Sequence, residues 1–138
     1  MTGEQFFEKF PFQYHDGTVS NVRVLGNDLV LSITRCPFSL QSEEDKNSLF
    51  QRLRFKNVTD IWLLDDKKMH ISDLPWEDRW KSATLAEVVD TLNDEGNYWI
   101  NDALMDDGMF LFDFLLRFRF DDIEILASRT NPEYFSHT

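Results

Sequence analysis

Phe110-Leu-Phe-Asp-Phe-Leu-Leu-Arg-Phe-Arg-Phe120 is the stretch that decides the fold class of this chain. Its six even positions all carry large apolar side chains, five of them phenylalanine, while charged residues stand among the odd positions. A strand places alternate residues on one face, whereas a helix would distribute the same six groups around its whole circumference. The stretch therefore predicts one long strand over residues 110–120 with a strongly apolar face.

Other runs with a period of two residues predict further strands. Two of them, Val22–Leu25 and Leu29–Ile33, flank the turn cluster Gly26-Asn27-Asp28, which is the pattern of a β-hairpin. The pair Asp121-Asp122 indicates a turn or bulge after the phenylalanine-rich run. Similar alternation predicts strands at 49–56, 58–64 and 123–128, with a short edge strand at 69–71.

Helical signals occur at two places. Thr84 and Glu87 form the capping-box pattern, in which the two side chains satisfy free amides at a helix N-terminus. Apolar residues then recur at helical spacing up to Leu92, and Gly96 follows as a stop, so we expect the main helix at 84–93. A short helical turn is expected at 4–10. Residues 36–47 read as a loop, 73–81 as irregular and 130–138 as a loose tail.

These elements predict an α+β domain. Strands joined by short turns favour a strongly twisted, mostly antiparallel sheet or partial barrel, with the 84–93 helix covering one side or end. Nothing in the sequence alternates strand and helix as a parallel sheet requires. No repeat, low-complexity tract or linker divides the 138 residues, so we expect a single domain over 1–138.

The charge of the chain limits its partners. Twenty-five acidic residues against fourteen basic ones give a formal net charge of -11, which repels nucleic acid and anionic membranes and favours a cationic protein partner. An aromatic content of 14% argues for a packed core rather than disorder. The sequence shows no signal peptide and no apolar run long enough to span a bilayer, so we expect a cytoplasmic protein.

No catalytic or metal-binding signature is present. Tyr14-His15-Asp16 leads into a turn, and neighbours on an extended chain point to opposite sides, so a structural role is favoured. His70 and Asp73 lie three residues apart, yet the chain has only three histidines and one cysteine, Cys36, for a zinc site. We therefore predict no catalytic residue, no metal and no cofactor. A small basic stripe at Arg52, Arg54 and Lys56 is expected to pair with carboxylates across strands.

Clustered acids are the strongest candidates for a binding surface. On the main helix, acids at i, i+3 and i+7 form one like-charged face that no lysine relieves, an unfavourable pattern typical of an anionic recognition face. A solvated helix face of an acidic protein is the alternative reading. Tryptophans supply candidate anchors, with core packing as their competing use. The predicted acidic face consists of Asp65, Asp66, Glu87, Asp90, Asp94, Glu95, Asp106 and Asp107. The predicted aromatic anchors are Trp76, Trp80 and Trp99, with Tyr98 beside them.

Four pieces of the chain resemble bacterial immunity proteins of polymorphic toxin systems and related small domains. They are the aromatic-His-Asp start at 14–16, the hairpin at 22–33, the stretch 53–61 and the final stretch 118–125. The resemblance implies a non-catalytic inhibitor that binds a cognate toxin domain, often a basic nuclease, and occludes its active site. The negative charge is consistent with such a partner, because a cationic cleft attracts an acidic competitor.

Two alternatives remain open at this point. An enzyme or small-ligand binder would have a pocket inside the curved sheet, lined by the phenylalanine-rich run and gated by the tryptophan-rich segment. A general protein-interaction module without a toxin partner is the other. An inhibitor should gather its acids on one exposed patch, while an enzyme should bring His15, His70 or a carboxylate pair together in a concave site.

Overall fold

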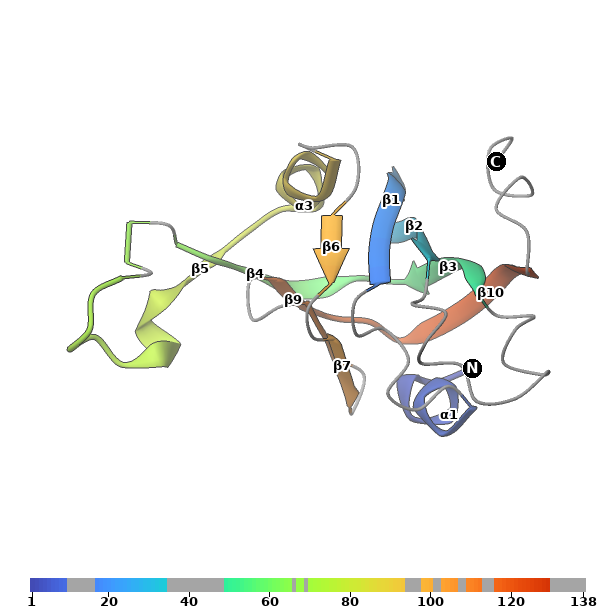
Figure 1. The fold of residues 1–138 in the computed structure, drawn as a ribbon, viewed down its shortest axis with the longest axis horizontal. Helices are drawn as coiled ribbons and strands as arrows, with labels where there is room; N and C mark the ends of the chain where they lie inside the picture. The colour runs from blue at the N-terminus through green and yellow to red at the C-terminus, as the bar shows by residue number, and fades with distance from the viewer. Residues whose placement is uncertain are drawn as a thin grey trace.

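The computed structural model describes residues 1–9, 17–34, 49–65, 67–68, 70–93, 98–100, 103–106, 109–112 and 116–129. They form an α+β fold in which all pairings between described strands are antiparallel and one main helix is present, as the sequence predicts. The two helices lie on opposite sides of the sheets (Figure 1). They are α1 (Gly3–Lys9) and α3 (Leu85–Asn93).

The strands divide between two five-stranded sheets. The first sheet has the order β10-β3-β2-β1-β6, and the second has the order β5-β4-β9-β8-β7. The first comprises β1 (Gly17–Leu25), β2 (Asp28–Thr34), β3 (Phe50–Lys56), β6 (Tyr98–Ile100) and β10 (Asp122–Arg129). The second comprises β4 (Thr59–Leu64), β5 (Trp80–Ser82), β7 (Ala103–Asp106), β8 (Met109–Phe112) and β9 (Leu116–Arg119).

The hairpin predicted around Gly26 is confirmed as β1 and β2. Gly26 has a φ of 62°, a left-handed conformation that glycine adopts without steric cost. A bulge in β1 lies between Ser20 and Arg23, where Asn21 also has a positive φ of 51°. A bulge inserts an extra residue and resets the alternation of side chains. Val19 and Val22 are consequently both buried in the core, although a regular strand would place them on opposite faces.

Asp28 ties the β1–β2 turn to the end of β3. Its Oδ2 accepts hydrogen bonds from Nε of Arg54 at 2.7 Å and pairs with Nη2 at 2.6 Å, while its Oδ1 accepts from the amide of Asn57 at 2.9 Å. The hydrogen bond from the Asn57 amide, followed by the one from Arg54, holds the pKa of the Asp28 carboxyl below its ordinary value of 3.8. The fold therefore favours the ionised form of Asp28.

Replacing Asp28 with asparagine should lower the free energy of unfolding at neutral pH by about 1–3 kcal/mol, because hydrogen bonds to a charged group are lost. Since folding lowers this pKa, the contribution is present above pH 3.8 and disappears as the pH falls through the folded-state value. Urea unfolding at about pH 7 and about pH 3 should show a smaller acid-induced loss in Asp28→Asn than in the parent chain. An equal loss in both proteins would contradict this role for Asp28.

Acid sensitivity should not vanish in that variant, because Asp122 behaves similarly. The α-ammonium of Met1 pairs with Oδ1 of Asp122 at 2.8 Å and holds the pKa of that carboxyl below its ordinary value. Met1 also exchanges two backbone hydrogen bonds with Ile123, at 2.9 and 2.7 Å. These bonds cover part of the outer edge of β10, an edge that would otherwise offer unpaired backbone groups.

The prediction of one continuous strand over 110–120 is wrong. The run forms two strands, β8 and β9, which pair antiparallel with Phe110 opposite Phe118 and Phe112 opposite Leu116. Directly opposed residues belong to the same face of an antiparallel pair. The even-numbered positions of β8 and β9 therefore lie on the same face of the sheet, as they would in one continuous strand. Residues 113–115, including Phe114, lie outside the described residues.

The core joins the two sheets. Phe55 of the first sheet meets Phe118 of the second edge to face at a centroid distance of 5.2 Å, and it meets Phe120 at 5.1 Å. Phe55 and Phe118 are fully buried, and Phe120 nearly so. Both helices contribute to the same apolar cluster, through Phe6 of α1 and through Val88 of α3. Edge-to-face pairs of this kind add stability beyond the area that they bury.

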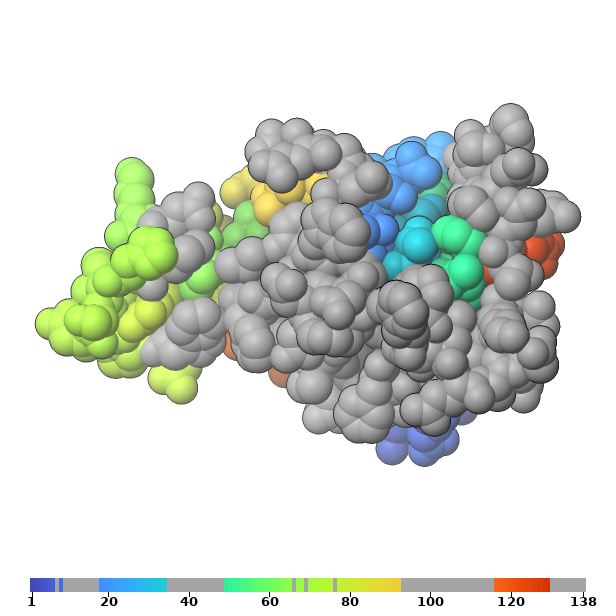
Figure 2. Space-filling model, viewed as in Figure 1, coloured from blue at the N-terminus to red at the C-terminus, as the bar shows by residue number. Residues whose placement is uncertain are grey.

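The β4–β5 connection departs from the prediction in two ways. His70 and Ile71 lie outside any strand, so the edge strand expected at 69–71 does not form at these two residues. The segment 73–81, expected to be irregular, contains the 3-10 helix η2 (Trp76–Arg79) and the start of β5. The guanidinium of Arg79 donates to the carbonyls of Ile71 and Leu74 at 2.7 and 2.9 Å. Figure 2 shows this connection, in green to yellow, as a lobe at one end of the molecule.

The basic stripe of β3 is paired as predicted at two of its three positions. Arg54 pairs with Asp28, and Nζ of Lys56 pairs with Oε2 of Glu124 at 3.0 Å. Arg52 differs, because it is 1% exposed and donates from Nη1 to Oγ of Ser32 at 2.7 Å rather than to a carboxylate. Burial lowers the pKa of the Arg52 guanidinium, and the nearby charge of Arg23 lowers it further.

Candidate functional site: the groove between β1 and α3

Helix α3 starts at the capping box that the sequence predicts. The amide of Glu87 donates to Oγ1 of Thr84 at 3.3 Å, and the amide of Thr84 donates to Oε1 of Glu87 at 3.2 Å. This reciprocal pair satisfies two backbone donors that the first turn of a helix leaves free. The Glu87 carboxylate is thus used in fixing where α3 begins, although the residue is exposed.

One face of α3 is buried against the core and another faces β1. Val88 and Leu92 are almost fully buried, whereas Val89 is half-buried and Ala86 and Asp90 are exposed. Helix α3 contacts β1. The side of α3 that carries Val89 lies beside β1 and stays partly exposed to solvent.

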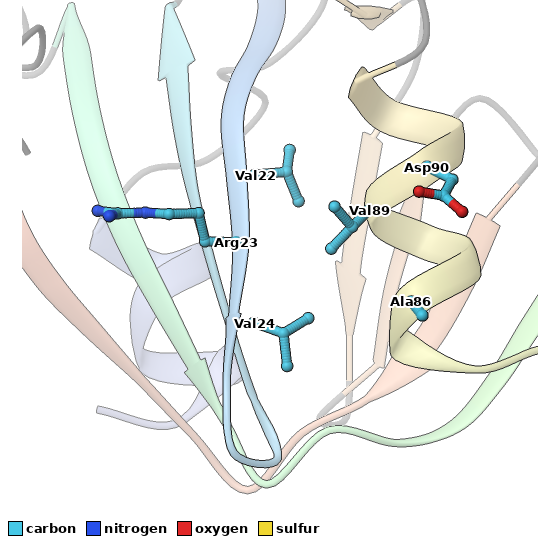
Figure 3. Close-up of a pocket in the computed structure, with 6 residues that line it drawn as sticks. All are labelled: Val22, Arg23, Val24, Ala86, Val89 and Asp90. Carbon is cyan, nitrogen blue, oxygen red and sulfur yellow. The ribbon is translucent and has the colours of Figure 1, made fainter.

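An open groove of about 470 Å³ lies between β1 and α3, lined by Val22, Arg23, Val24, Ala86, Val89 and Asp90. In Figure 3, Val22 and Val24 point toward the helix and Val89 points back toward the strand, while Arg23 points away from the groove. The floor is therefore aliphatic. Arg23 and Asp90 are the two charged residues of the lining, and the guanidinium of Arg23 extends away from the helix while the carboxylate of Asp90 stands on the helix side. Val24 is 36% exposed, and Leu25 beyond it is 48% exposed, so apolar surface continues toward the hairpin turn.

The structure describes three side chains of the predicted acidic face, and they differ in what they do. Glu87 caps α3, and Asp90 stands at the groove. Asp65 is half-buried, and its Oδ1 accepts a hydrogen bond from the amide of Lys67 at 3.0 Å within a turn. Asp106 lies in β7, where the backbone alone is described. The remaining four, Asp66, Asp94, Glu95 and Asp107, fall outside the described residues.

Among the predicted aromatic anchors, Trp80 is 8% exposed and its ring lies 4.9 Å from Cζ of Arg117. The same guanidinium lies 5.5 Å from the ring of Trp62, so Arg117 is stacked by two tryptophans. No sequence pattern distinguishes Trp62 or Arg117 as site residues. The backbone of Trp76 lies in η2, and the backbones of Tyr98 and Trp99 lie in β6; their side chains are not described.

The described part of the chain contains no cluster of side chains that would support the catalytic or the metal-binding alternative. No group of three or more His, Cys, Asp or Glu side chains within it could hold a metal ion. His70 and Asp73 are both exposed on the β4–β5 lobe, and His15 and Cys36 lie outside the described residues. Phe118 and Phe120, expected in one alternative to line a pocket, are packed in the core. No helix in the described ranges has the length and apolar character needed to cross a bilayer.

Comparison of the chain with protein-family models, with curated proteins and with solved structures finds no match. The chemistry of the groove must therefore be inferred from its own side chains.

Proposed function

We propose that this chain is a non-catalytic binding protein that neutralises a cationic protein partner, in the manner of a bacterial immunity protein that occludes a basic toxin domain. The observation that carries the proposal is the aliphatic groove between β1 and α3 with the exposed carboxylate of Asp90 at its rim. A groove of this composition suits an aliphatic side chain of the partner followed by a lysine or arginine.

The charge of the whole chain supports the same kind of partner. A net charge of -11 raises the encounter rate with a cationic surface through long-range steering. Steering sets how fast two proteins meet, whereas a buried contact sets how long they stay together. Val24 lines the groove together with Asp90, and the exposed Leu25 follows it in β1. Apolar area of this kind at the centre of an interface supplies affinity once water is excluded.

Co-expression with the product of the adjacent gene tests the proposal. We expect a stable complex, relief of growth inhibition if that product is toxic, and association that slows as salt is added. Asp90→Lys should raise the Kd about 30-fold or more, because a close charge pair becomes a like-charge contact.

Asp73→Lys is the matched control, since it changes the net charge by the same amount at an exposed position on the β4–β5 lobe. It should leave the Kd within a few-fold of the parent value, as expected for a charge outside the interface. Equal weakening by the two substitutions would show that net charge alone acts and would reject the groove as the site. Absence of both complex and growth relief would reject the immunity function.

A further inference from the structure

A second feature, on the other sheet, carries a charge of the opposite sign. Trp62 of β4 and Arg117 of β9 are directly opposed in the register of the second sheet. Trp80 lies on β5, at the other side of β4, where it pairs with Leu64, two residues from Trp62. The guanidinium of Arg117 extends across β4 and reaches the ring of Trp80 as well. The three side chains, Trp62, Trp80 and Arg117, are called the arginine clamp below.

In the part of the chain that the structure describes, Arg117 has no carboxylate partner. Arg54, Lys56 and Arg119 each pair with an acid, the last with Asp60 at 3.7 Å. Within the described ranges Arg117 has no ion pair, and its Nε is buried without a hydrogen-bond acceptor. A desolvated donor without a partner is costly, and it is rare in folded proteins. Among the described residues the guanidinium of Arg117 is thus a cation that no acid neutralises, although the chain has twenty-five acidic residues.

The clamp suits the guanidinium to an oxyanion that can accept two parallel hydrogen bonds. The ring centres lie 5.5 and 4.9 Å from Cζ, within the range of cation–π attraction, and they fix the orientation of the planar group. A fixed guanidinium presents its terminal amino groups as a fork that matches the two oxygens of a carboxylate. Because the fork is already ordered, a carboxylate binds it without the entropy loss of ordering a free arginine.

We propose that the arginine clamp is a docking site for an aspartate or glutamate side chain of a partner protein. Trp62 and Arg117 are both half-buried, so they remain accessible, and tryptophan and arginine are the residues most enriched among interface hot spots. A nucleic-acid occupant would bring many phosphates against a net charge of -11, whereas a single acidic side chain brings one charge. The site is separate from the groove and does not depend on the function proposed for it.

Titration of the uniformly ¹⁵N-labelled full chain with two blocked tripeptides tests the site. The first peptide is Gly-Glu-Gly, and the second is Gly-Gln-Gly, which differs only in lacking the carboxylate; sodium acetate replaces chloride at constant ionic strength as a third probe. The Nε–H signal of Arg117 and the indole N–H signals of Trp62 and Trp80 are followed. We expect saturating shifts with the glutamate peptide and none with the glutamine peptide.

Variants assign the response to the clamp. Arg117→Lys keeps the charge but not the planar fork, so the indole shifts should disappear. Arg119→Gln removes the neighbouring cation of the same strand and should leave the response unchanged. If Arg117→Lys does not fold, the difference between the responses of the parent chain to the glutamate and glutamine peptides still tests the proposal. Equal responses to both peptides, no response to either, a response to acetate alone, or an unchanged response in a folded Arg117→Lys protein would each overturn the proposal.

Discussion

Replacing Phe118 with alanine is expected to lower the free energy of unfolding by about 3–5 kcal/mol. Phe118 is fully buried and stacks edge to face on Phe55, which belongs to the other sheet. Truncation removes this contact and leaves a cavity where the two sheets meet. Since small domains are stable by only about 5–15 kcal/mol, much of the stability of the chain should be lost.

Urea unfolding followed by tryptophan fluorescence measures the effect. Leu126→Ala is the control, because Leu126 is 43% exposed on β10, and its free energy of unfolding should change by less than about 0.5 kcal/mol. Phe118→Leu should lie between the alanine variant and the parent chain, since it keeps part of the buried volume. A loss below about 1 kcal/mol for Phe118→Ala would show that Phe118 is not central to the core.

Replacing Arg52 with methionine should instead raise the free energy of unfolding, by about 1–3 kcal/mol. Arg52 is 1% exposed, and within the described residues it pairs with no carboxylate; its Nη2 has no hydrogen-bond partner. Burying a charge costs several kcal/mol unless it is compensated, and the hydrogen bond to Ser32 returns only part of that cost. Methionine fills a similar volume without a charge and adapts to irregular space.

Thermal and urea unfolding of two Arg52 variants separate charge from volume. Arg52→Met should unfold at a higher denaturant concentration than the parent chain, whereas Arg52→Ala should unfold at a lower one because it leaves a cavity. Destabilisation by both substitutions would indicate that the guanidinium contributes more through its hydrogen bonds than its burial costs. That result would contradict the prediction.

Local signals allowed parts of this fold to be predicted from sequence. The hairpin around Gly26 follows from turn residues flanked by alternating apolar positions, and the start of α3 follows from Thr84 and Glu87. The hairpin and the helix start both depend on residues a few positions apart, so the interactions that cause them can be recognised in the local sequence. The antiparallel, mostly β character follows in the same way from the period-2 runs.

Long-range contacts set the limits of that prediction. The run at 110–120 folds back on itself, although the segment between the two strands contains a single turn-favouring residue, Asp113. The clamp joins Trp62, Trp80 and Arg117 through the order of strands in the sheet, which no local pattern encodes. The groove arises where β1 and α3 meet, and periodicity identified Asp90 as exposed without indicating what lies beside it.

The order of strands in the first sheet has a kinetic consequence. β1 pairs with β6 and β3 pairs with β10, so two strands from the first half of the chain can complete their pairing only with strands from the second half. Chains dominated by such pairings must close large loops before the contacts reward them, and they reach the native state in milliseconds to seconds rather than microseconds. A newly made copy should therefore leave one edge of β1 and one edge of β3 unpaired until β6 and β10 have been made, the interval in which it is most vulnerable to aggregation.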